Sequence, residues 1–313
     1  MEVTCGVSQG SILGPQLFLV YINDMHINLT CHLSLFADDS ALLFSHKDSN
    51  YIAEYLSKQL SSCKKWLIDN GLSLHVGKTE CVLFGSRRKL GKVHDFRVLC
   101  DGLPVNQVTT VRYLGVHLDG NMNGQVHAGN LLKKCAGRVS FLYRKAGFLD
   151  FNCRKILCSA LLQPYLDYCC SSWYSSITKH LKNKLDILQR RMTRYIFSLD
   201  QLIHVDASDF RKLSWMTFPD RVKFFKLIHV FKIKSGTAPN YMSLNFMPVT
   251  STHSYNTRGS IHDFSISKDL ADASTSFAYT AIKHWNDLPA FLKEIRTESV
   301  FRRKLRQFLT TEY

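Results

Sequence analysis

The chain has 313 residues, of which 45% are hydrophobic and 21% charged, and this balance fits a globular protein that buries a core. The longest apolar run near the start, residues 17–22, is far too short to span a bilayer, which excludes a membrane anchor there. Lysine and arginine outnumber aspartate and glutamate by 40 to 25, and the resulting net charge of +15 suits an acidic partner such as nucleic acid.

Near its start the chain has a predicted loop over residues 6–15, with glycines at positions 6, 10 and 14, and this loop contains Gln9, Gly10 and Ser11. Glycine lets the backbone approach a ligand closely, and the glutamine and serine side chains offer hydrogen bonds. The alternative is a plain helix start with Ser11 as its cap. Pro15 suits the first turn of a helix, and the apolar pattern predicts that this helix continues through residue 25.

Two adjacent acids, Asp38 and Asp39, interrupt an otherwise apolar stretch. The flanking residues 33–36 and 41–44 read as two buried strands joined by a tight turn. A hairpin turn holds carboxylates rigidly, and carboxylate oxygens are the ligands that Mg²⁺ prefers. The alternative is an ordinary polar turn, where aspartate is common. The apolar flanks favour the functional reading.

The next elements alternate between helix and strand. An apolar stripe at helical spacing from Ile52 to Leu67 predicts a helix that ends at Asn70 and Gly71. Short strands are expected at residues 72–74 and 81–84, and a basic loop at residues 87–89. A strand pair is expected over residues 111–118, centred on Gly115.

From residue 125 the pattern becomes helical. Three apolar stripes follow one another, at residues 131–142, 156–161 and 181–196. Residues 121–200 carry 13 lysines and arginines against 4 aspartates, a net charge of +9. Such a basic helical segment suits phosphate backbones, and a merely solvated basic face is the alternative. Residues 235–262 read as a loop, and two helices, around Trp285 and around Leu305, close the chain.

The ten cysteines contain no Cys-x-x-Cys pair, and they predict neither a zinc site nor a disulfide framework. No secretory signal is visible. We therefore expect an intracellular protein, in the nucleus or cytoplasm, with reduced thiols.

Taken in order, the motifs resemble the reverse transcriptase of non-LTR retrotransposons of the jockey/CR1 kind. The Gly6–Pro15 loop resembles the family's nucleotide and template loop, and Phe36-Ala37-Asp38-Asp39 resembles its metal-binding hairpin. Gly77-Lys78-Thr79-Glu80 and Tyr113-Leu114-Gly115-Val116 match the next two motifs. Tyr255-Asn256-Thr257-Arg258 and Trp285-Asn286-Asp287-Leu288-Pro289 also resemble these elements, so the likeness covers nearly the whole chain.

The resemblance implies RNA-templated DNA synthesis, in which dNTPs are added to a DNA primer on an RNA template with Mg²⁺ as cofactor. Asp38 and Asp39 would hold the metal, and Lys78 would assist the leaving pyrophosphate. The nucleotide and template would contact Gln9, Gly10, Ser11 and Ala37. The primer would contact Tyr113, Leu114 and Gly115. Backbone phosphates would contact a basic set on the helices that follow, namely Lys133, Lys134, Arg138, Arg190, Arg191 and Arg194.

One feature of the family pattern is missing. The family's first metal-binding aspartate lies upstream of the glycine loop, and the acids before Asp38 are Glu2 and Asp24, neither at that place. The fingers and any endonuclease are also absent. We therefore expect a C-terminal fragment that begins inside the palm, binds Mg²⁺ weakly and does not polymerise alone.

The predicted fold class is α+β. A partial polymerase palm would occupy residues 1–120, a basic helical thumb residues 121–200, and a helical C-terminal extension residues 201–313. The first rival is a non-catalytic nucleic-acid-binding remnant, either inert or adopted by the host. The second is a helical scaffold unrelated to polymerases, which an exposed Asp38 outside any hairpin would support.

Overall fold

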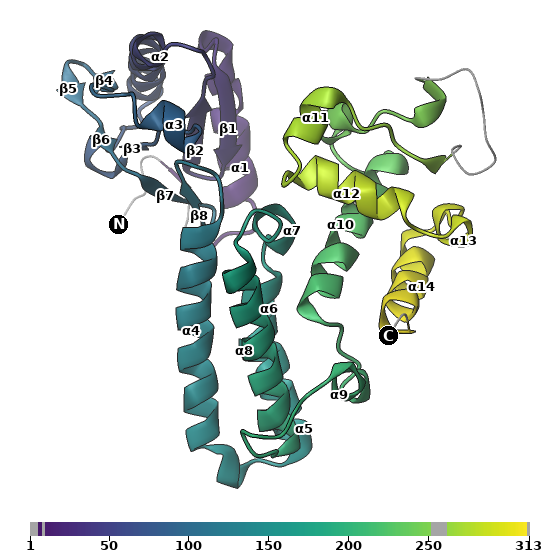
Figure 1. The fold of residues 1–313 in the computed structure, drawn as a ribbon. Helices are drawn as coiled ribbons and strands as arrows, with labels where there is room; N and C mark the ends of the chain where they lie inside the picture. Colours follow the sequence, from purple (N-terminus) through teal and green to yellow (C-terminus); the bar gives the residue numbers. More distant parts are fainter. Residues whose placement is uncertain (1–5, 8–9, 252–261, 312–313) are drawn as a thin grey trace. The chain divides into compact units, whose positions relative to one another are not determined.

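The computed structural model describes residues 6–7, 10–251 and 262–311, and the chain divides into two units (Figure 1). The first unit spans residues 1–111 with 119–121, and the second spans residues 112–118 with 122–313. Small sheets accompany helices in the first unit, and helices dominate the second. The mixture of α and β structure confirms the predicted class.

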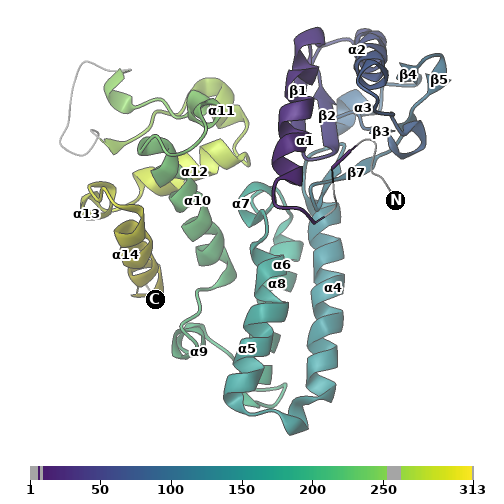
Figure 2. The ribbon, with the colours of Figure 1, turned by 180° about the vertical axis from the view of Figure 1, so that it is seen from behind.

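The first unit begins with helix α1, Gly14–Ile22, and a 3₁₀ helix η1, Asn23–Asn28. The sequence predicts one α-helix through residue 25, but the α-helix ends at Ile22. Asn23 and Asp24 have short polar side chains that compete with the helical backbone, which explains the change. Within the unit, α1 lies alongside the first two strands (Figure 2), and its Phe18 packs against a small core around Trp66.

Strands β1, His32–Phe36, and β2, Asp39–Leu43, form an antiparallel hairpin. The hairpin confirms the prediction, but the expectation of buried strands is wrong, because every strand residue is half-buried or exposed. Leu33 packs towards the core around Trp66, whereas Leu42 packs towards a second small core around Phe96. Two small cores cover the hairpin only in part.

Helix α2, Ser49–Asp69, follows the predicted stripe and buries Ile52, Leu60 and Cys63. The Asp48 side chain caps its start by accepting a hydrogen bond from the Asn50 amide, at 2.9 Å. The helix ends at Asn70, and Gly71 follows with φ +68°. The C-terminal end confirms the sequence prediction.

The rest of the first unit is built from short pieces: η2 Val76–Lys78, β3 Glu80–Cys81, α3 Arg87–Leu90, β4 Leu99–Cys100, β5 Leu103–Pro104 and β6 Asn106–Gln107. β3 pairs in parallel with β6, and β4 pairs antiparallel with β5. The strand expected at residues 72–74 is wrong, because these residues form no strand. The basic loop expected at 87–89 is a turn of helix, since the Ser86 hydroxyl accepts a hydrogen bond from the Lys89 amide.

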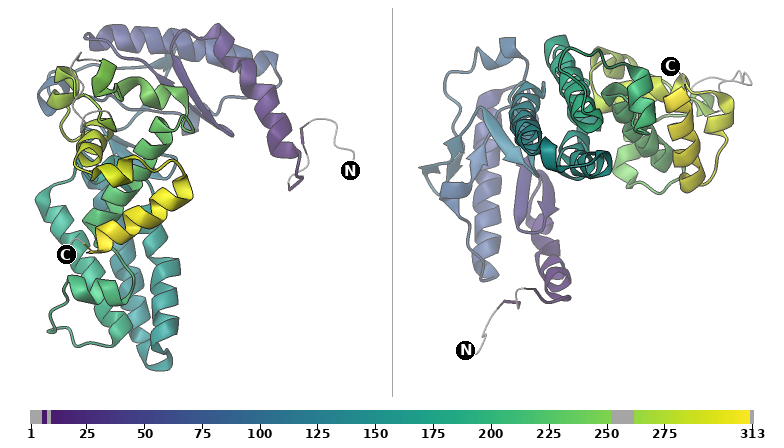
Figure 3. Two further views of the ribbon diagram at one scale, coloured as in Figure 1. Left: turned by 90° about the vertical axis from the view of Figure 1, so that its right-hand side faces the viewer. Right: turned by 90° about the horizontal axis from the view of Figure 1, so that it is seen from below.

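Strands β7, Thr110–Tyr113, and β8, Val116–Asp119, form the predicted strand pair, and the chain passes between the two units within them. The second unit then continues with α4 Gln125–Arg144, η3 Ala146–Phe148, α5 Phe151–Leu161, α6 Gln163–Asp167, α7 Cys170–Trp173 and α8 Lys179–Phe197. α4, α5 and α8 pack side by side (Figure 3, right). The predicted stripes of α4 and α8 bury Leu131, Val139, Leu185 and Met192.

The predicted stripe of α5 has the wrong phase. Ile156 is 64% exposed, whereas Cys158 is fully buried. The core runs instead through Cys158, Leu162 and Leu166, and Pro164 lies in the first turn of the new helix α6. The face of α5 that is buried therefore depends on the helices against which it packs.

The second unit ends with a further core around Trp285 and Phe301. It is built from α9 Ala207–Lys212, α10 Phe218–Lys234, η4 Asn240–Asn245, η5 Val249–Ser251, α11 Lys268–Asp272, α12 Phe277–Asn286, α13 Ala290–Lys293 and α14 Glu298–Thr311. α12 and α14 both pack against α10 and confirm the two closing helices. The sequence missed α10, whose apolar residues face several directions.

The Trp-Asn-Asp-Leu-Pro motif has a structural role in this second core. Trp285 is fully buried, and its indole N–H donates to the His262 carbonyl at 2.8 Å. The Asn286 side chain both accepts from the Phe264 amide and donates to the Phe264 carbonyl, at 3.1 and 2.8 Å. The motif thus ties residues 262–264 to α12. The Tyr255–Arg258 motif lies outside the described residues.

Across the ranges that the structure describes, no helix is both long and apolar enough to cross a membrane. The nine cysteines in these ranges are all free. Five of them are buried, as expected for small apolar core residues: Cys63, Cys100, Cys135, Cys158 and Cys170.

Candidate functional site

The paired acids lie at the tight turn of the β1–β2 hairpin. Phe36 pairs with Asp39, so Ala37 and Asp38 alone form the connection, and Asp39 begins β2. Ala37 has φ +51°, a left-handed conformation that costs a non-glycine residue roughly 1 kcal/mol. Two-residue turns that begin this way follow the twist of the strands, which explains why the chain accepts the cost. Both carboxylates are exposed.

These carboxylates are the right donors for Mg²⁺ but do not complete a metal centre. Two hard oxygen donors side by side suit a divalent cation. Among the described residues, however, no three His, Cys, Asp or Glu side chains gather where they could share one ion. Asp24 lies in η1 and is exposed, and Glu2 lies outside the described residues.

The glycine loop is described only in part. Gln9 lies outside the described residues, so its expected place beside Asp38 stays a prediction. Gly10 has φ +82°, a conformation that side chains other than glycine rarely adopt. The Ser11 hydroxyl accepts a hydrogen bond from the Gly14 amide at 3.0 Å. That contact supports the helix-start role for Ser11, and a ligand role remains a proposal.

Lys78 ends the 3₁₀ helix η2 and is exposed. The following residue, Thr79, donates its hydroxyl to the His75 carbonyl at 3.1 Å, and Glu80 opens strand β3. Lys78 is thus presented on a turn that two neighbouring contacts stabilise. Its role at a leaving pyrophosphate remains a proposal.

The Tyr113–Val116 motif forms a second two-residue turn. Leu114 and Gly115 connect β7 to β8, with φ +44° and +82°. The hydroxyl of Tyr168, which lies between α6 and α7, donates to the Leu114 carbonyl at 2.6 Å. The sequence analysis did not identify Tyr168, because Tyr168 and Leu114 are 54 residues apart and no sequence spacing relates them.

The same hairpin is held at its second strand by a buried histidine. The His117 amide donates to Nδ1 of His127, on α4, at 3.3 Å. His127 is 7% exposed, and its ring packs edge-on against Trp173. Burial lowers the pKa of His127 from its ordinary value of 6.5, and His117 adds to the effect. Nδ1 must be unprotonated to accept this hydrogen bond.

We expect acid to destabilise this unit through His127. Well above pH 6.5 the histidine is neutral in both the folded and the unfolded chain, so it does not change the free energy of unfolding with pH. Below pH 6.5 the unfolded chain binds the proton more readily than the folded one, so the free energy of unfolding falls as the pH drops towards the folded pKa. Urea unfolding of the wild type and of His127→Gln, which keeps an acceptor but does not titrate, tests this. The free-energy difference between the two should change between pH 7 and 5. Parallel pH curves would contradict the prediction.

The basic set on α4 and α8 divides into bound arginines and open lysines. Arg138 donates to the Leu161 carbonyl, Arg190 to the Val205 carbonyl and Arg194 to the Ile203 carbonyl, at 2.6 to 2.7 Å. Arg191 donates to the Ser140 hydroxyl at 3.1 Å. Arg138 and Arg191 therefore link helices, Arg190 and Arg194 tie α8 to the loop that follows it, and phosphate contact remains a proposal for all four.

The two lysines of the set are more available. Lys133 and Lys134 are exposed on α4. The Lys134 ammonium lies 4.2 Å from the centre of the Tyr165 ring, over which Arg138 also stacks. Lys133 is therefore the lysine of the set for which the structure gives no ring contact among the described residues, and phosphate contact remains a proposal for both lysines.

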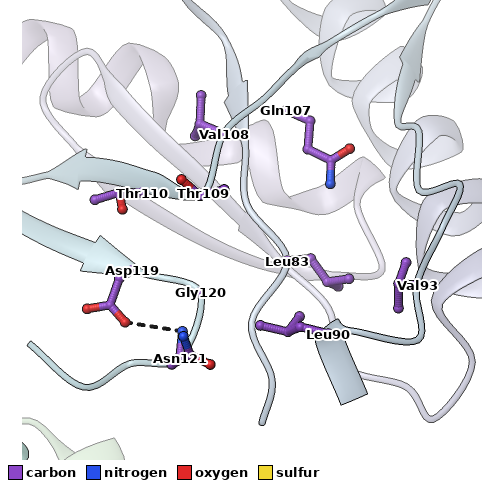
Figure 4. A pocket seen from close by; sticks show the side chains of 10 residues that line it. All are labelled: Leu83, Leu90, Val93, Gln107, Val108, Thr109, Thr110, Asp119, Gly120 and Asn121. Atoms are coloured by element: carbon purple, nitrogen blue, oxygen red, sulfur yellow. Dashed lines mark hydrogen bonds between the residues drawn. The ribbon is translucent and has the colours of Figure 1, made fainter. Parts of the chain in front are cut away.

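A cavity of about 420 Å³ lies in the first unit, apart from the predicted residues (Figure 4). Leu83, Leu90 and Val93 form its apolar side, and Asp119 and Asn121 lie opposite. The Asn121 amide donates to the Asp119 carboxylate at 3.2 Å. None of the ten lining residues belongs to a predicted site.

Comparison with known proteins bears directly on these hairpins. Residues 1–118 match the family described as reverse transcriptase (RNA-dependent DNA polymerase). The match includes the Asp38–Asp39 turn, the Lys78 turn and the Leu114–Gly115 turn. It ends just before Asp119, at the second strand of the β7–β8 hairpin.

Curated relatives come from fruit-fly mobile elements. The chain is 27% identical over 205 residues to the RNA-directed DNA polymerase from mobile element jockey of Drosophila melanogaster. It is 24% and 27% identical to the probable RNA-directed DNA polymerases from transposons X-element and BS of the same species. The alignments cover 61–62% of this chain and 22% of each relative, so the chain spans about a fifth of their length.

The alignment of 205 residues with the jockey polymerase is longer than the 118 residues of the family match, so the likeness also reaches helices of the second unit. The order of motifs, the two hairpin turns and these relatives agree. The resemblance seen in the sequence is confirmed: residues 1–118 match the reverse transcriptase family, and the chain is similar to RNA-directed DNA polymerases of jockey and related mobile elements.

Proposed function

We propose that this chain is part of an RNA-directed DNA polymerase of a non-LTR retrotransposon, which adds dNTPs to the 3′-OH of a DNA primer on an RNA template. The observation that carries the proposal is the adjacent pair Asp38 and Asp39 on a two-residue hairpin turn, within residues of the reverse transcriptase family. In this proposal residues 1–120 are palm, 121–200 are a thumb and 201–313 are an extension.

The proposed roles follow the hairpins. Asp38 and Asp39 would contribute ligands to the Mg²⁺ ions of the complete polymerase, which would supply Lewis-acid assistance to nucleotidyl transfer. Lys78 would supply positive charge for the leaving group. Tyr113, Leu114 and Gly115 would contact the primer. Gly10, Ser11 and Ala37, with Gln9, would contact the nucleotide and template.

A second candidate function is nucleic-acid binding without catalysis. It is favoured by one specific observation, namely that the described residues hold no group of three metal-ligating side chains. Both candidates bind nucleic acid, and they differ in chemistry. Binding therefore tests what they share, and primer extension separates them.

We expect salt-sensitive binding of an RNA–DNA primer–template through the basic helices. Charge reversal at two phosphate contacts should reduce the slope of log affinity against log salt by about 2. Lys133→Glu with Lys134→Glu should show this change in titrations at several salt concentrations. The matched control is Lys268→Glu with Lys304→Glu, the same change at exposed lysines outside residues 121–200. An equal loss in both variants would show that only bulk charge matters, and no binding at low salt would refute both candidates.

A further inference from the structure

The Leu114–Gly115 turn adopts a conformation that its own sequence disfavours. Both residues have positive φ, +44° and +82°, as in the tight turns that join antiparallel strands. Glycine adopts this conformation freely, but a leucine there costs on the order of 1–2 kcal/mol. Strain of this kind persists only where the surroundings impose the conformation.

Tyr168 supplies the contact that imposes it. Its hydroxyl donates to the Leu114 carbonyl at 2.6 Å. Its ring lies so close to Gly115 that a Cβ there would be 3.3 Å from Tyr168 Cε1. One side chain therefore contacts both residues of the turn, through a hydrogen bond and through van der Waals packing.

Tyr168 is itself anchored to the helical core. Its carbonyl accepts a hydrogen bond from the indole N–H of Trp173, at 3.1 Å, and Trp173 is 4% exposed. Trp173 also packs against His127, which accepts from the second strand of the hairpin. The turn and the strand are thus tied to the same buried tryptophan, and all of these residues belong to the second unit.

We propose that Tyr168 is a positioning residue for the recessed 3′ end of a primer–template duplex. By holding the Leu114–Gly115 turn, it makes the turn one rigid body with the helices around Trp173. A primer end that contacts the turn is then held at a set place relative to those helices. The inference rests on the proposed primer contact of Tyr113, Leu114 and Gly115.

The test measures how tightly the full 313-residue chain binds each of two duplexes. One is an RNA–DNA duplex with a recessed DNA 3′-OH, and the other has the same sequence with a blunt end. The measured quantity is the ratio of the two dissociation constants. We expect the wild type to prefer the recessed end and Tyr168→Phe to lower that preference roughly two- to tenfold, as loss of one hydrogen bond would.

Tyr143→Phe is the matched control. It removes the same kind of bond, since the Tyr143 hydroxyl donates to the Arg191 carbonyl at 3.0 Å, but it does not contact the hairpin. It should leave the ratio unchanged. Hydrogen exchange over residues 112–118 of the free protein gives a second readout, which Tyr168→Phe should accelerate and Tyr143→Phe should not.

Each contrary result has a distinct meaning. A wild type that binds both ends equally would refute the primer contact of the hairpin, and this inference with it. A wild-type preference that survives in Tyr168→Phe, or that falls equally in Tyr143→Phe, would refute the role of Tyr168 and leave the proposed function standing. Unchanged exchange over residues 112–118 in Tyr168→Phe would refute the positioning whatever the binding shows.

Discussion

Primer extension by the isolated 313-residue chain is expected to incorporate no dNTP on a primed RNA template, with either Mg²⁺ or Mn²⁺. Asp38 and Asp39 supply adjacent carboxylates, but no third metal-ligating side chain joins them among the described residues. In-line phosphoryl transfer of this kind needs two ions that clamp the attacking and leaving oxygens. A misplacement of about 1 Å can already cost on the order of a hundredfold in rate.

The assay needs a positive control and a binding control. A complete retrotransposon polymerase should extend the same primer, and this chain should bind the same duplex under the same conditions. Asp38→Ala is assayed beside the wild type. Incorporation that Asp38→Ala abolishes would overturn the prediction and show that another acid, such as Glu2 or Asp24, completes the site. Binding without incorporation would favour the non-catalytic candidate.

The second large effect concerns a largely buried ion pair in the helical unit. Arg221, on α10, makes a two-pronged contact with Asp167, at the end of α6, and the Nε–Oδ1 bond is 2.9 Å long. The two side chains are 13% and 22% exposed. Burial raises the pKa of the Asp167 carboxyl, and Arg221 opposes that rise. With its amide oxygen turned towards them, Gln163 accepts from both Trp215 and Arg221.

Arg221→Met is expected to lower the free energy of unfolding by about 3–5 kcal/mol, because it leaves the Asp167 carboxylate buried without its partner. Urea unfolding followed by tryptophan fluorescence measures it, since Trp173, Trp215 and Trp285 all lie in the second unit. Adding Asp167→Leu should recover most of the loss, because no buried charge then remains.

Lys212→Met provides the control, an ion pair of the same unit whose cation, unlike Arg221, is exposed. Lys212 is 64% exposed and pairs with Asp209 at 2.9 Å. Its loss should cost less than about 1 kcal/mol. An equally small cost for Arg221→Met would show that the Asp167 pair behaves as a surface contact and would contradict the prediction.

Several elements could be predicted from the sequence because their determinants are local. The stripes of α2, α4, α8, α12 and α14 repeat at helical spacing, and each helix buries the face that its stripe predicts. The β1–β2 hairpin follows from apolar runs that flank a short connection, and the β7–β8 hairpin follows from short strand patterns on either side of Gly115. The motif order also identified the reverse transcriptase family from the sequence alone.

Burial could not be predicted in the same way, because it depends on which elements meet. The β1–β2 strands read as buried, yet two small cores cover them only in part. α10 shows no single apolar face, because it packs against both α12 and α14. Helix α10 also carries Lys226, whose side chain is fully buried and donates hydrogen bonds to the Ser175 and Thr280 hydroxyls. Burial lowers the pKa of Lys226 to about 8.

The sequence by itself determined the likeness to reverse transcriptases, the carboxylate pair and the order of most helices, because each lies within a short stretch whose pattern reports its own conformation. Only the tertiary structure decided how the Leu114–Gly115 turn is held and which arginines are already bound. Tyr168 reaches Leu114 across 54 residues, and Arg138 reaches the Leu161 carbonyl across 23. Contacts of that range depend on how helices pack, and neither periodicity nor composition records them.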